Sequence, residues 1–281
     1  MKTGVIDTGG GLRGVYATGV LDCCLEQGVR FDVGIGVSAG SANVSSYIAG
    51  QKKRNYRFYI EYSARKQYMS FSNFIKKKTY IDMDYVYGTL SNSDGENPLD
   101  YDAFTQSSQT FYAVATDVET GEVKYFDKGD MPRDDYGVLK ASCAIPFVCK
   151  PYEVQGRLYY DGALSDPIPV EKAFSLGCDK VVLILTKPKD VLRTPEKDEK
   201  LAKGIQKKYP RAAEELRLRA EKYNKGVALA KQYEEQGKLC IIAPDDTCGM
   251  DTLTRNHFAM EEFYRKGFRD GWKIKSFLNL E

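Results

Sequence analysis

The chain has 281 residues, and its 41 Lys and Arg against 39 Asp and Glu give a formal net charge of +2. This near-balance argues against a nucleic-acid-binding protein, because phosphate contacts need a net basic face. Hydrophobic residues make up 42% and charged residues 28%, an ordinary globular balance that argues against wholesale disorder. The single histidine, His257, excludes zinc sites and metal clusters built on several histidines.

Targeting signals and cysteine usage suggest a compartment. No run of 18 apolar residues is present, so no transmembrane helix is expected. The residues from Met1 to Asp7 meet an acid and a glycine run without an apolar signal core. The seven cysteines are scattered without a C-x-x-C pair, which fits free thiols. We therefore expect a cytoplasmic protein.

The first fifty residues predict a strand, a helix, a second strand and a second helix. Residues 4–7 and 31–37 are the expected strands, and residues 44–48 mark the second helix. Between the strands, apolar residues recur at helical spacing at Ala17, Val20, Leu21 and Cys24. Strands that alternate with helices imply a parallel sheet with helices on its faces.

The rest of the chain continues the α/β pattern. Strands are expected at residues 110–116, 123–126, 181–185 and 239–243, with a hairpin whose arms, 147–154 and 158–160, flank Gln155 and Gly156. Residues 187–237 are charge-rich and helical in composition, interrupted by prolines, and residues 260–268 mark a C-terminal helix. The chain reads as one α/β domain, 1–281, with a helical insertion near 190–236.

A glycine run, Gly9-Gly10-Gly11-Leu12-Arg13-Gly14, follows the first strand and opens the first helix. It matches the dinucleotide fingerprint G-x-G-x-x-G, in which a pyrophosphate rests on the helix N-terminus. The same backbone N–H groups could instead stabilise an oxyanion. A dinucleotide site needs an acid at the carboxyl end of the second strand, and that strand ends in Gly36-Val37-Ser38-Ala39-Gly40. The absence of this acid favours the oxyanion interpretation.

The sequence Gly36-x-Ser38-x-Gly40 predicts a sharp turn from strand to helix with an exposed serine hydroxyl. The two glycines remove side chains that would clash in such a turn. In a parallel sheet this turn and the glycine run lie at the carboxyl ends of adjacent strands, where ligands bind. Ser38 is therefore a candidate nucleophile.

A serine nucleophile needs a base, and the chain offers two arrangements. His257 with Asp161 would give the order Ser, Asp, His of α/β-hydrolases, but a lone histidine at the start of a helix is more typical of a surface or capping residue. Asp161 could instead act directly. It ends a strand and is followed by the small residues Gly162 and Ala163, which fits either an approach point or an Asx turn.

These motifs in this order resemble the patatin-like phospholipase family. The glycine run, the serine elbow and Asp161-Gly162-Ala163 carry the resemblance, and residues 141–147 resemble the family's Ala-Ser-x-x-x-Pro segment. Together they span about residues 4–170, and the part from 187 to 281 forms a helical and C-terminal extension that adds little. Ala163 stands where a second glycine is commoner, and Pro167 stands where an asparagine is frequent.

The resemblance implies a three-layer α/β/α fold with a mainly parallel central sheet. It also implies a serine lipid acyl hydrolase with Ser38 as nucleophile and Asp161 as proton acceptor, with no cofactor or metal. Gly9, Gly10 and Gly11 would form the oxyanion hole, near Arg13 and Gly14. The expected substrate is a phospholipid or another acyl ester. An acyl-thioesterase with the same dyad, a peptidase and a nucleotide-binding protein remain alternatives.

Two segments allow more than one interpretation. Residues 51–90 interleave aromatic residues with the basic residues Lys76, Lys77 and Lys78. They could line an acyl pocket or touch an anionic lipid surface, but a helical cap that packs its aromatics on the sheet is the favoured interpretation. The charge-rich residues 190–236 are expected to form a solvated helical face. The sequence leaves the oligomeric state open.

Overall fold

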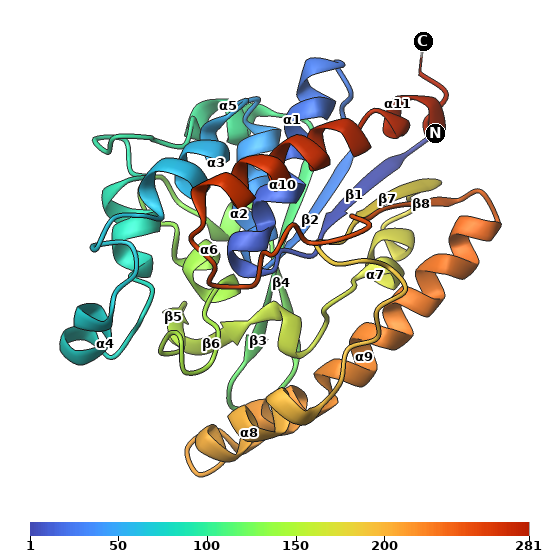
Figure 1. Ribbon diagram of the computed structural model, residues 1–281. Helices are drawn as coiled ribbons and strands as arrows, with labels where there is room; N and C mark the ends of the chain where they lie inside the picture. The colour runs from blue at the N-terminus through green and yellow to red at the C-terminus, as the bar shows by residue number, and fades with distance from the viewer. Residues whose placement is uncertain (281) are drawn as a thin grey trace.

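A mainly parallel sheet of eight strands forms the centre of the computed structural model, which describes residues 1–280 (Figure 1). The strand order is β5-β6-β3-β2-β1-β7-β8, and β4 also pairs with β3. Strands β3, β2, β1, β7 and β8 run parallel, whereas β4, β5 and β6 add antiparallel pairs. The strands are β1 Thr3–Asp7, β2 Val33–Val37, β3 Thr110–Asp117, β4 Val123–Phe126, β5 Tyr152–Val154, β6 Arg157–Asp161, β7 Lys180–Ile184 and β8 Leu239–Ile242.

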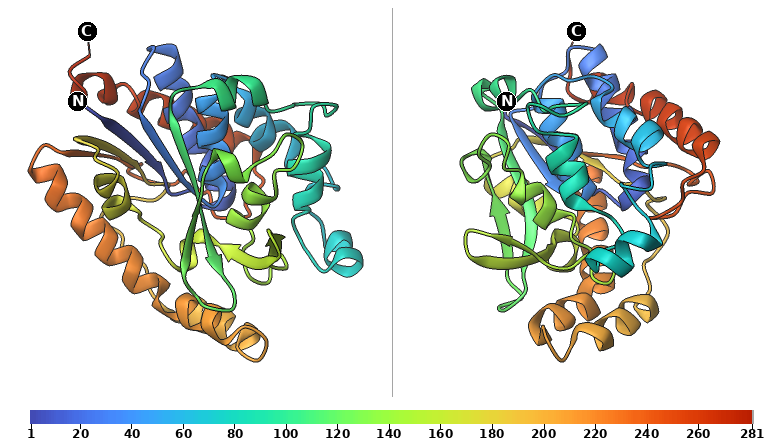
Figure 2. Two further views of the ribbon diagram at one scale, coloured as in Figure 1. Left: turned by 180° about the vertical axis from the view of Figure 1, so that it is seen from behind. Right: turned by 90° about the vertical axis from the view of Figure 1, so that its left-hand side faces the viewer.

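Helices cover both faces of the sheet (Figures 1 and 2). On one face, α1, α2 and α10 pack together over residues such as Val5 and Val182. On the other face, α7 and α9 cover residues such as Ile6 and Leu183. The alternation of Val5 and Ile6 between the two cores is the period of two expected of a strand buried on both faces. The three-layer α/β/α prediction is confirmed.

The helices vary widely in length. Pro210 is the first residue of α9 and Pro195 immediately precedes α8, so the predicted proline breaks in the charge-rich segment coincide with helix starts. The helices are α1 Gly14–Glu26, α2 Ala39–Ile48, α3 Arg54–Arg57, α4 Phe71–Lys77, α5 Tyr101–Gln106, α6 Gly137–Ser142, α7 Val170–Ser175, α8 Glu196–Ile205, α9 Pro210–Glu235, α10 His257–Asp270 and α11 Lys273–Phe277.

The predicted strands agree with the structure to within one or two residues at their ends, except at one place. Residues 147–151, expected to begin the hairpin, lie outside β5, although the turn at Gln155 and Gly156 is present. Helices α3 and α4 lie in the segment 51–90, for which a helical cap was favoured, whereas the short helices α5, α6, α7 and α11 were not expected. Helices this short are marginal alone and depend on tertiary packing, so their local sequence carries a weak signal.

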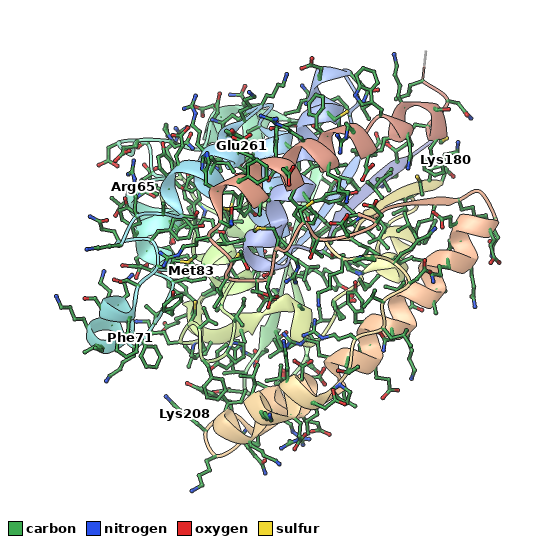
Figure 3. The ribbon with its side chains drawn as sticks, in the orientation of Figure 1. Arg65, Phe71, Met83, Lys180, Lys208 and Glu261 are labelled. Atoms are coloured by element: carbon green, nitrogen blue, oxygen red, sulfur yellow. The ribbon has the colours of Figure 1, made fainter. Side chains whose placement is uncertain are left out.

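Helix α4 stands away from the body of the protein, and Phe71 at its start points outward (Figure 3). Ser70 caps this helix by accepting a hydrogen bond from the Asn73 N–H at 3.2 Å. None of the helices within residues 1–280 combines the length and the apolar character needed to cross a bilayer.

Candidate active site

Ser38 lies at the turn between β2 and α2, at the carboxyl edge of the parallel strands. Its backbone has φ 56° and ψ −134°, a left-handed conformation that is strained for a residue with a side chain. The side chains around it leave it only 5% exposed. A serine held in this rare conformation at the start of a helix has the backbone expected of the sharp turn that the sequence predicts.

Both glycines of the elbow are required by close backbone contacts. A Cβ on Gly36 would lie 2.3 Å from the Ser41 Cα, and a Cβ on Gly40 would lie 2.2 Å from the Asp7 carbonyl oxygen. Both distances are far below van der Waals contact. The turn therefore brings α2 against the end of β1, which places Ser38 beside the glycine run.

The glycine run packs directly on this elbow. A Cβ on Gly9 would lie 2.3 Å from the Val37 carbonyl oxygen, and Gly9, Gly10 and Gly11 all have positive φ angles. Thr186, just after β7, donates a hydrogen bond from its hydroxyl to the Gly9 carbonyl at 2.6 Å. Three neighbouring strands thus fix the path of the run.

The Asp7 side chain helps to hold the glycine run in place, a role that the sequence motifs did not predict. Its carboxylate accepts hydrogen bonds from the Gly9 N–H at 2.8 Å and from the Asn43 side chain at 2.8 Å. Burial raises its pKa to about 6 despite these two donors. An acid at the end of a buried strand, directly before a glycine run, is the sequence signal that could have identified it.

The structure narrows the set of predicted oxyanion donors. The Gly9 N–H is already bonded to Asp7, and the Gly14 N–H bonds back to the carbonyls of Gly11 and Leu12. These two N–H groups are therefore unavailable to a ligand, which corrects the expectation for them. Within residues 1–280 the N–H groups of Gly10 and Gly11 have no hydrogen-bond acceptor.

Asp161 ends β6 opposite Ala115 of β3 and is only 2% exposed. Its carboxylate accepts the Ala163 N–H at 2.8 Å, an Asx-type bond that orients the side chain. Gly162 is required here, because a Cβ on it would lie 2.2 Å from the Val114 carbonyl oxygen. The Asp-Gly-Ala motif therefore fits both interpretations: it forms an Asx-type turn, and its carboxylate lies at the cavity that Ser38 also lines.

Burial raises the pKa of the Asp161 carboxyl above its ordinary value. The Ala163 N–H, which donates to the carboxylate, and the nearby Ser38 hydroxyl lower the pKa in part. The positive charges of Arg219 and Arg193 also lower it. A buried carboxylate with a raised pKa beside a serine hydroxyl is a stronger base than an exposed aspartate.

The predicted Ala-Ser-x-x-x-Pro segment connects the two candidate residues. Ser142, the last residue of α6, accepts a hydrogen bond from the Ser38 N–H at 3.1 Å. Two residues later, the Ala144 carbonyl accepts the Asp161 N–H at 3.0 Å. One short segment therefore sets the positions of Ser38 and Asp161 relative to each other.

Ser38 and Asp161 border a polar cavity of about 480 Å³, which we call the polar cavity. Gly9, Gly10 and Gly11 form part of its wall. Its far side comes from the helical insertion, through residues such as Arg193, Arg219 and Tyr223. Residues 190–236 were expected to form a solvated helical face. That expectation is wrong for the side of α8 and α9 that borders the polar cavity, at the carboxyl ends of the strands (Figure 1).

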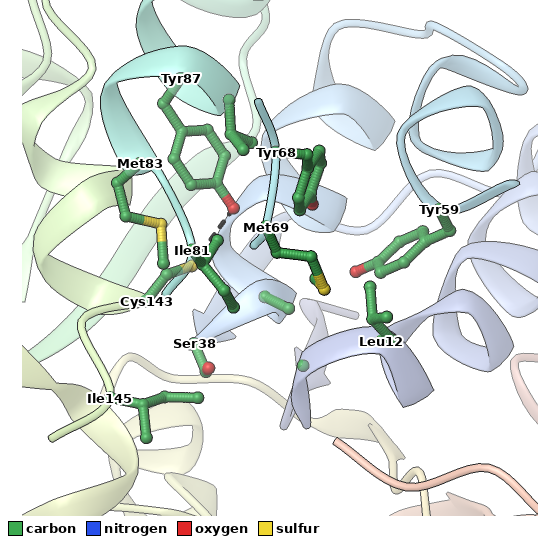
Figure 4. A pocket seen from close by; sticks show the side chains of 13 residues that line it. Leu12, Ser38, Tyr59, Tyr68, Met69, Ile81, Met83, Tyr87, Cys143 and Ile145 are labelled. Atoms are coloured by element: carbon green, nitrogen blue, oxygen red, sulfur yellow. Dashed lines mark hydrogen bonds between the residues drawn. The ribbon is translucent and has the colours of Figure 1, made fainter. Parts of the chain in front are cut away.

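A second, smaller cavity of about 50 Å³ opens on the other side of Ser38, and we call it the apolar cavity (Figure 4). Its walls are mainly aromatic and aliphatic, and most of the wall residues come from the segment 59–87. The wall side chains are those of Leu12, Tyr59, Tyr68, Met69, Ile81, Met83, Val86, Tyr87, Cys143 and Ile145. The Tyr87 hydroxyl and the Cys143 sulfur are 3.3 Å apart there. The segment 51–90 does pack on the body, as favoured, but it also forms this pocket.

His257 is separate from both cavities. It is the first residue of α10 and is exposed, while Asn256 caps the helix by accepting the Ala259 N–H at 3.0 Å. The surface interpretation of this histidine therefore agrees with the structure.

A strained serine at the carboxyl edge of the parallel strands and a buried acid thus border one cavity of a three-layer α/β/α fold. Residues 8–174 match the family model described as patatin-like phospholipase. The chain belongs to the patatin-like phospholipase family. Residues 209–278 match a second model, described as a domain of unknown function, DUF6363.

Several proteins are similar to parts of this chain. The uncharacterized protein YjjU of Escherichia coli is 29% identical over 202 residues, which cover 69% of this chain and 55% of YjjU. Lysophospholipase nte1 of Emericella nidulans is 23% identical over 185 residues, covering 64% of this chain and 12% of that protein. The chain thus spans about half of YjjU and a much smaller part of nte1.

One solved structure, VipD from Legionella pneumophila, is similar to this chain with a TM-score of 0.47 and 12% identity. The similarity covers 98% of this chain and 67% of the VipD chain.

Proposed function

We propose that this protein is a serine lipid acyl hydrolase that cleaves carboxylic esters through Ser38 and Asp161. The observation that carries the proposal is the position of Ser38 between the two cavities. One side of the nucleophile offers a small apolar pocket that suits the first carbons of an acyl chain, and the other offers a polar cavity for the alcohol part. We also propose that residues 187–281 belong to the same domain, since β8 completes the sheet and α9 borders the polar cavity.

In the first half of the reaction, Asp161 accepts the proton of the Ser38 hydroxyl as Oγ attacks the ester carbonyl. The N–H groups of Gly10 and Gly11 donate hydrogen bonds to the resulting oxyanion. When the tetrahedral intermediate collapses, the carbon–oxygen ester bond breaks and Asp161 returns the proton to the leaving alcohol. The product is an acyl group on Ser38.

In the second half, water replaces the alcohol. Asp161 accepts a proton from the water as it attacks the acyl carbonyl, and the same two N–H groups hold the second oxyanion. The bond to Ser38 Oγ breaks, Oγ recovers the proton, and the fatty acid leaves. No histidine takes part in either half.

A fluorophosphonate probe tests this proposal, because it phosphonylates only an activated serine. We expect one label, mapped by mass spectrometry to Ser38, together with release of fatty acid from a lysophospholipid. A label on another serine, or an unlabelled and folded protein that binds a dinucleotide, would contradict the hydrolase. Faster cleavage of an acyl thioester than of the matched ester would favour the thioesterase alternative.

We further propose that α4 contacts the lipid surface from which the substrate comes. Phe71, Phe74 and Ile75 are exposed by 70%, 43% and 60%, an unusual cluster for a water-facing helix. Lys76 and Lys78 beside them are exposed and suit anionic headgroups. The ends of this protrusion pair at Met69 and Ile81, and both residues line the apolar cavity.

The double variant Phe71→Ser with Phe74→Ser is expected to bind anionic vesicles at least about tenfold more weakly. Each phenylalanine that becomes buried in the bilayer contributes about 1.5–3 kcal/mol to the binding free energy. Vesicle flotation measures the change. Trp272→Ser is the matched control, since this aromatic side chain is 57% exposed at the far end of α10 and should leave binding intact. Equal losses in both variants would argue against a role specific to α4.

A further inference from the structure

The polar cavity contains more positive than negative charge. Three carboxylates line it, namely Asp161, Asp198 and Asp251. Five cationic side chains line it, namely Arg13, Lys187, Arg193, Lys197 and Arg219. Like charges that converge on one cavity repel one another, so their convergence is costly unless an anion binds there.

Two of the carboxylates are already committed to arginines. Asp198 is 1% exposed and pairs with both Arg193 and Arg219, which fixes the two guanidinium groups at the cavity wall. Asp251 accepts a hydrogen bond from one terminal nitrogen of Arg13 at 2.8 Å. The third carboxylate is Asp161, which faces Ser38. No acid within residues 1–280 forms an ion pair with Lys187 or Lys197.

Arg13 has an unused donor edge. Its side chain is 8% exposed, and its Nε has no hydrogen-bond partner within the described residues. The guanidinium lies against Gly10, so this edge is next to the proposed oxyanion donors. An unsatisfied buried donor is costly, and a hydrogen bond to a ligand oxygen would remove that cost.

Lys187 shows the same excess of charge. Burial and the nearby positive charges of Arg13 and Arg193 lower the pKa of its ammonium group. Lys187 lies three residues beyond the end of β7 and therefore comes from a third part of the chain. Residues distant in sequence thus place unpaired donors around one cavity. Four of the five cationic residues lie outside residues 8–174, the part of the chain that matches the patatin-like phospholipase model.

We propose that the polar cavity binds the phosphate of a phospholipid headgroup that carries no amine, beside the ester that Ser38 attacks. This inference rests on the proposed hydrolase function and adds the chemistry of the alcohol side. The fork of a guanidinium and the point charge of a lysine are both suited to phosphate oxygens. With the acyl chain in the apolar cavity, the phosphate of a glycerophospholipid lies only a few bonds from the ester carbonyl.

Two other substrates fit less well. The ammonium of a choline or ethanolamine headgroup needs an aromatic cage or a free carboxylate. This cavity offers one aromatic side chain, Tyr223, and three acids. Asp198 and Asp251 are already paired with arginines, and Asp161 is the proposed base. In an acyl-CoA the phosphates lie at the far end of a long arm from the thioester, whereas these cations share a cavity with Ser38.

The test compares lysophosphatidic acid, lysophosphatidylcholine and monoacylglycerol with the same acyl chain in the same neutral micelles. We expect kcat/KM for lysophosphatidic acid to exceed that of each other ester by roughly tenfold. In the double variant Lys187→Gln with Lys197→Gln, this preference should fall by about tenfold. Lys203→Gln is the matched control, because Lys203 lies on the same helix, α8, and its side chain is 70% exposed.

A wild-type protein without the preference, or a double variant that keeps it, would overturn the proposal. So would a lysine dependence seen with acyl-CoA and not with lysophosphatidic acid. If no ester is cleaved at all, the hydrolase itself fails, and a binding measurement on the Ser38→Ala protein separates the two failures.

In that measurement, glycerol 3-phosphate is expected to raise the melting temperature of the Ser38→Ala protein, and the two lysine substitutions should abolish the shift. No shift would overturn the phosphate site independently of catalysis. A shift with inorganic phosphate but none with glycerol 3-phosphate would identify a free-phosphate site and also overturn the headgroup proposal.

Discussion

Ser38→Ala is expected to lower kcat/KM for ester hydrolysis by roughly 10⁵-fold or more, because knocking out the nucleophile of a serine hydrolase has an effect of this order. The fold should persist, since alanine can occupy the same turn. The elbow conformation itself, with φ 56°, is strained for serine and alanine alike. Ser38→Gly removes that strain and should therefore be more stable than Ser38→Ala by about 1 kcal/mol.

Hydrolysis of a lysophospholipid and urea denaturation measure the two effects. Ser45→Ala is the matched control on the same helix, because its hydroxyl bonds only to the Ala42 carbonyl at 2.9 Å, away from both cavities. Substantial hydrolysis by a folded Ser38→Ala protein would rule out Ser38 as the nucleophile.

Asp161→Asn is expected to lower kcat/KM by roughly 10⁴-fold, since an amide cannot accept the serine proton. The amide can keep the geometry, with its oxygen on the Ala163 N–H and its NH₂ toward Ser38. His257→Ala is the discriminating control, because the Ser-Asp-His alternative predicts an equal loss there. We expect no loss, as His257 is exposed at the start of α10 and does not line either cavity.

The acid limb of the pH profile reports the same residue. Asp161 must be ionised to act as a base, so kcat/KM should fall as the pH drops through its pKa. Because burial raises that pKa, the fall should begin at a higher pH than for an exposed aspartate. An acid limb at the ordinary aspartate pKa would contradict a buried base.

The stability effect of Asp161→Asn has the opposite sign to its effect on activity. The folded protein binds the Asp161 proton more tightly than the unfolded chain does, because the folded pKa is raised. Above that raised pKa, the ionised carboxylate therefore opposes folding, and the penalty disappears below the unfolded pKa. At neutral pH the Asn variant should unfold at an equal or higher temperature, which calorimetry can measure.

The local sequence of this protein determined the backbone framework around Ser38. The serine turn, the glycine run and the Asp-Gly pair each encode a backbone path that few residues can follow, such as the positive φ angles of Gly9 to Gly11. The strands that lead into the glycine run and the serine turn, β1 and β2, are buried on both faces. Their apolar residues therefore predicted that these two segments are strands. These signals are short-range, and for that reason they could be interpreted without the fold.

The tertiary structure alone decided which charges and apolar side chains surround Ser38. In the sequence Arg219 belongs to an ordinary charged helix, and only the packing of α9 across the sheet edge brings it into the polar cavity. Likewise, only the folded structure shows that the Asp7 carboxylate accepts the Gly9 N–H and so withdraws it from any ligand. Side-chain direction and hydrogen-bond pairing depend on contacts between residues far apart in the chain, which periodicity and spacing do not encode.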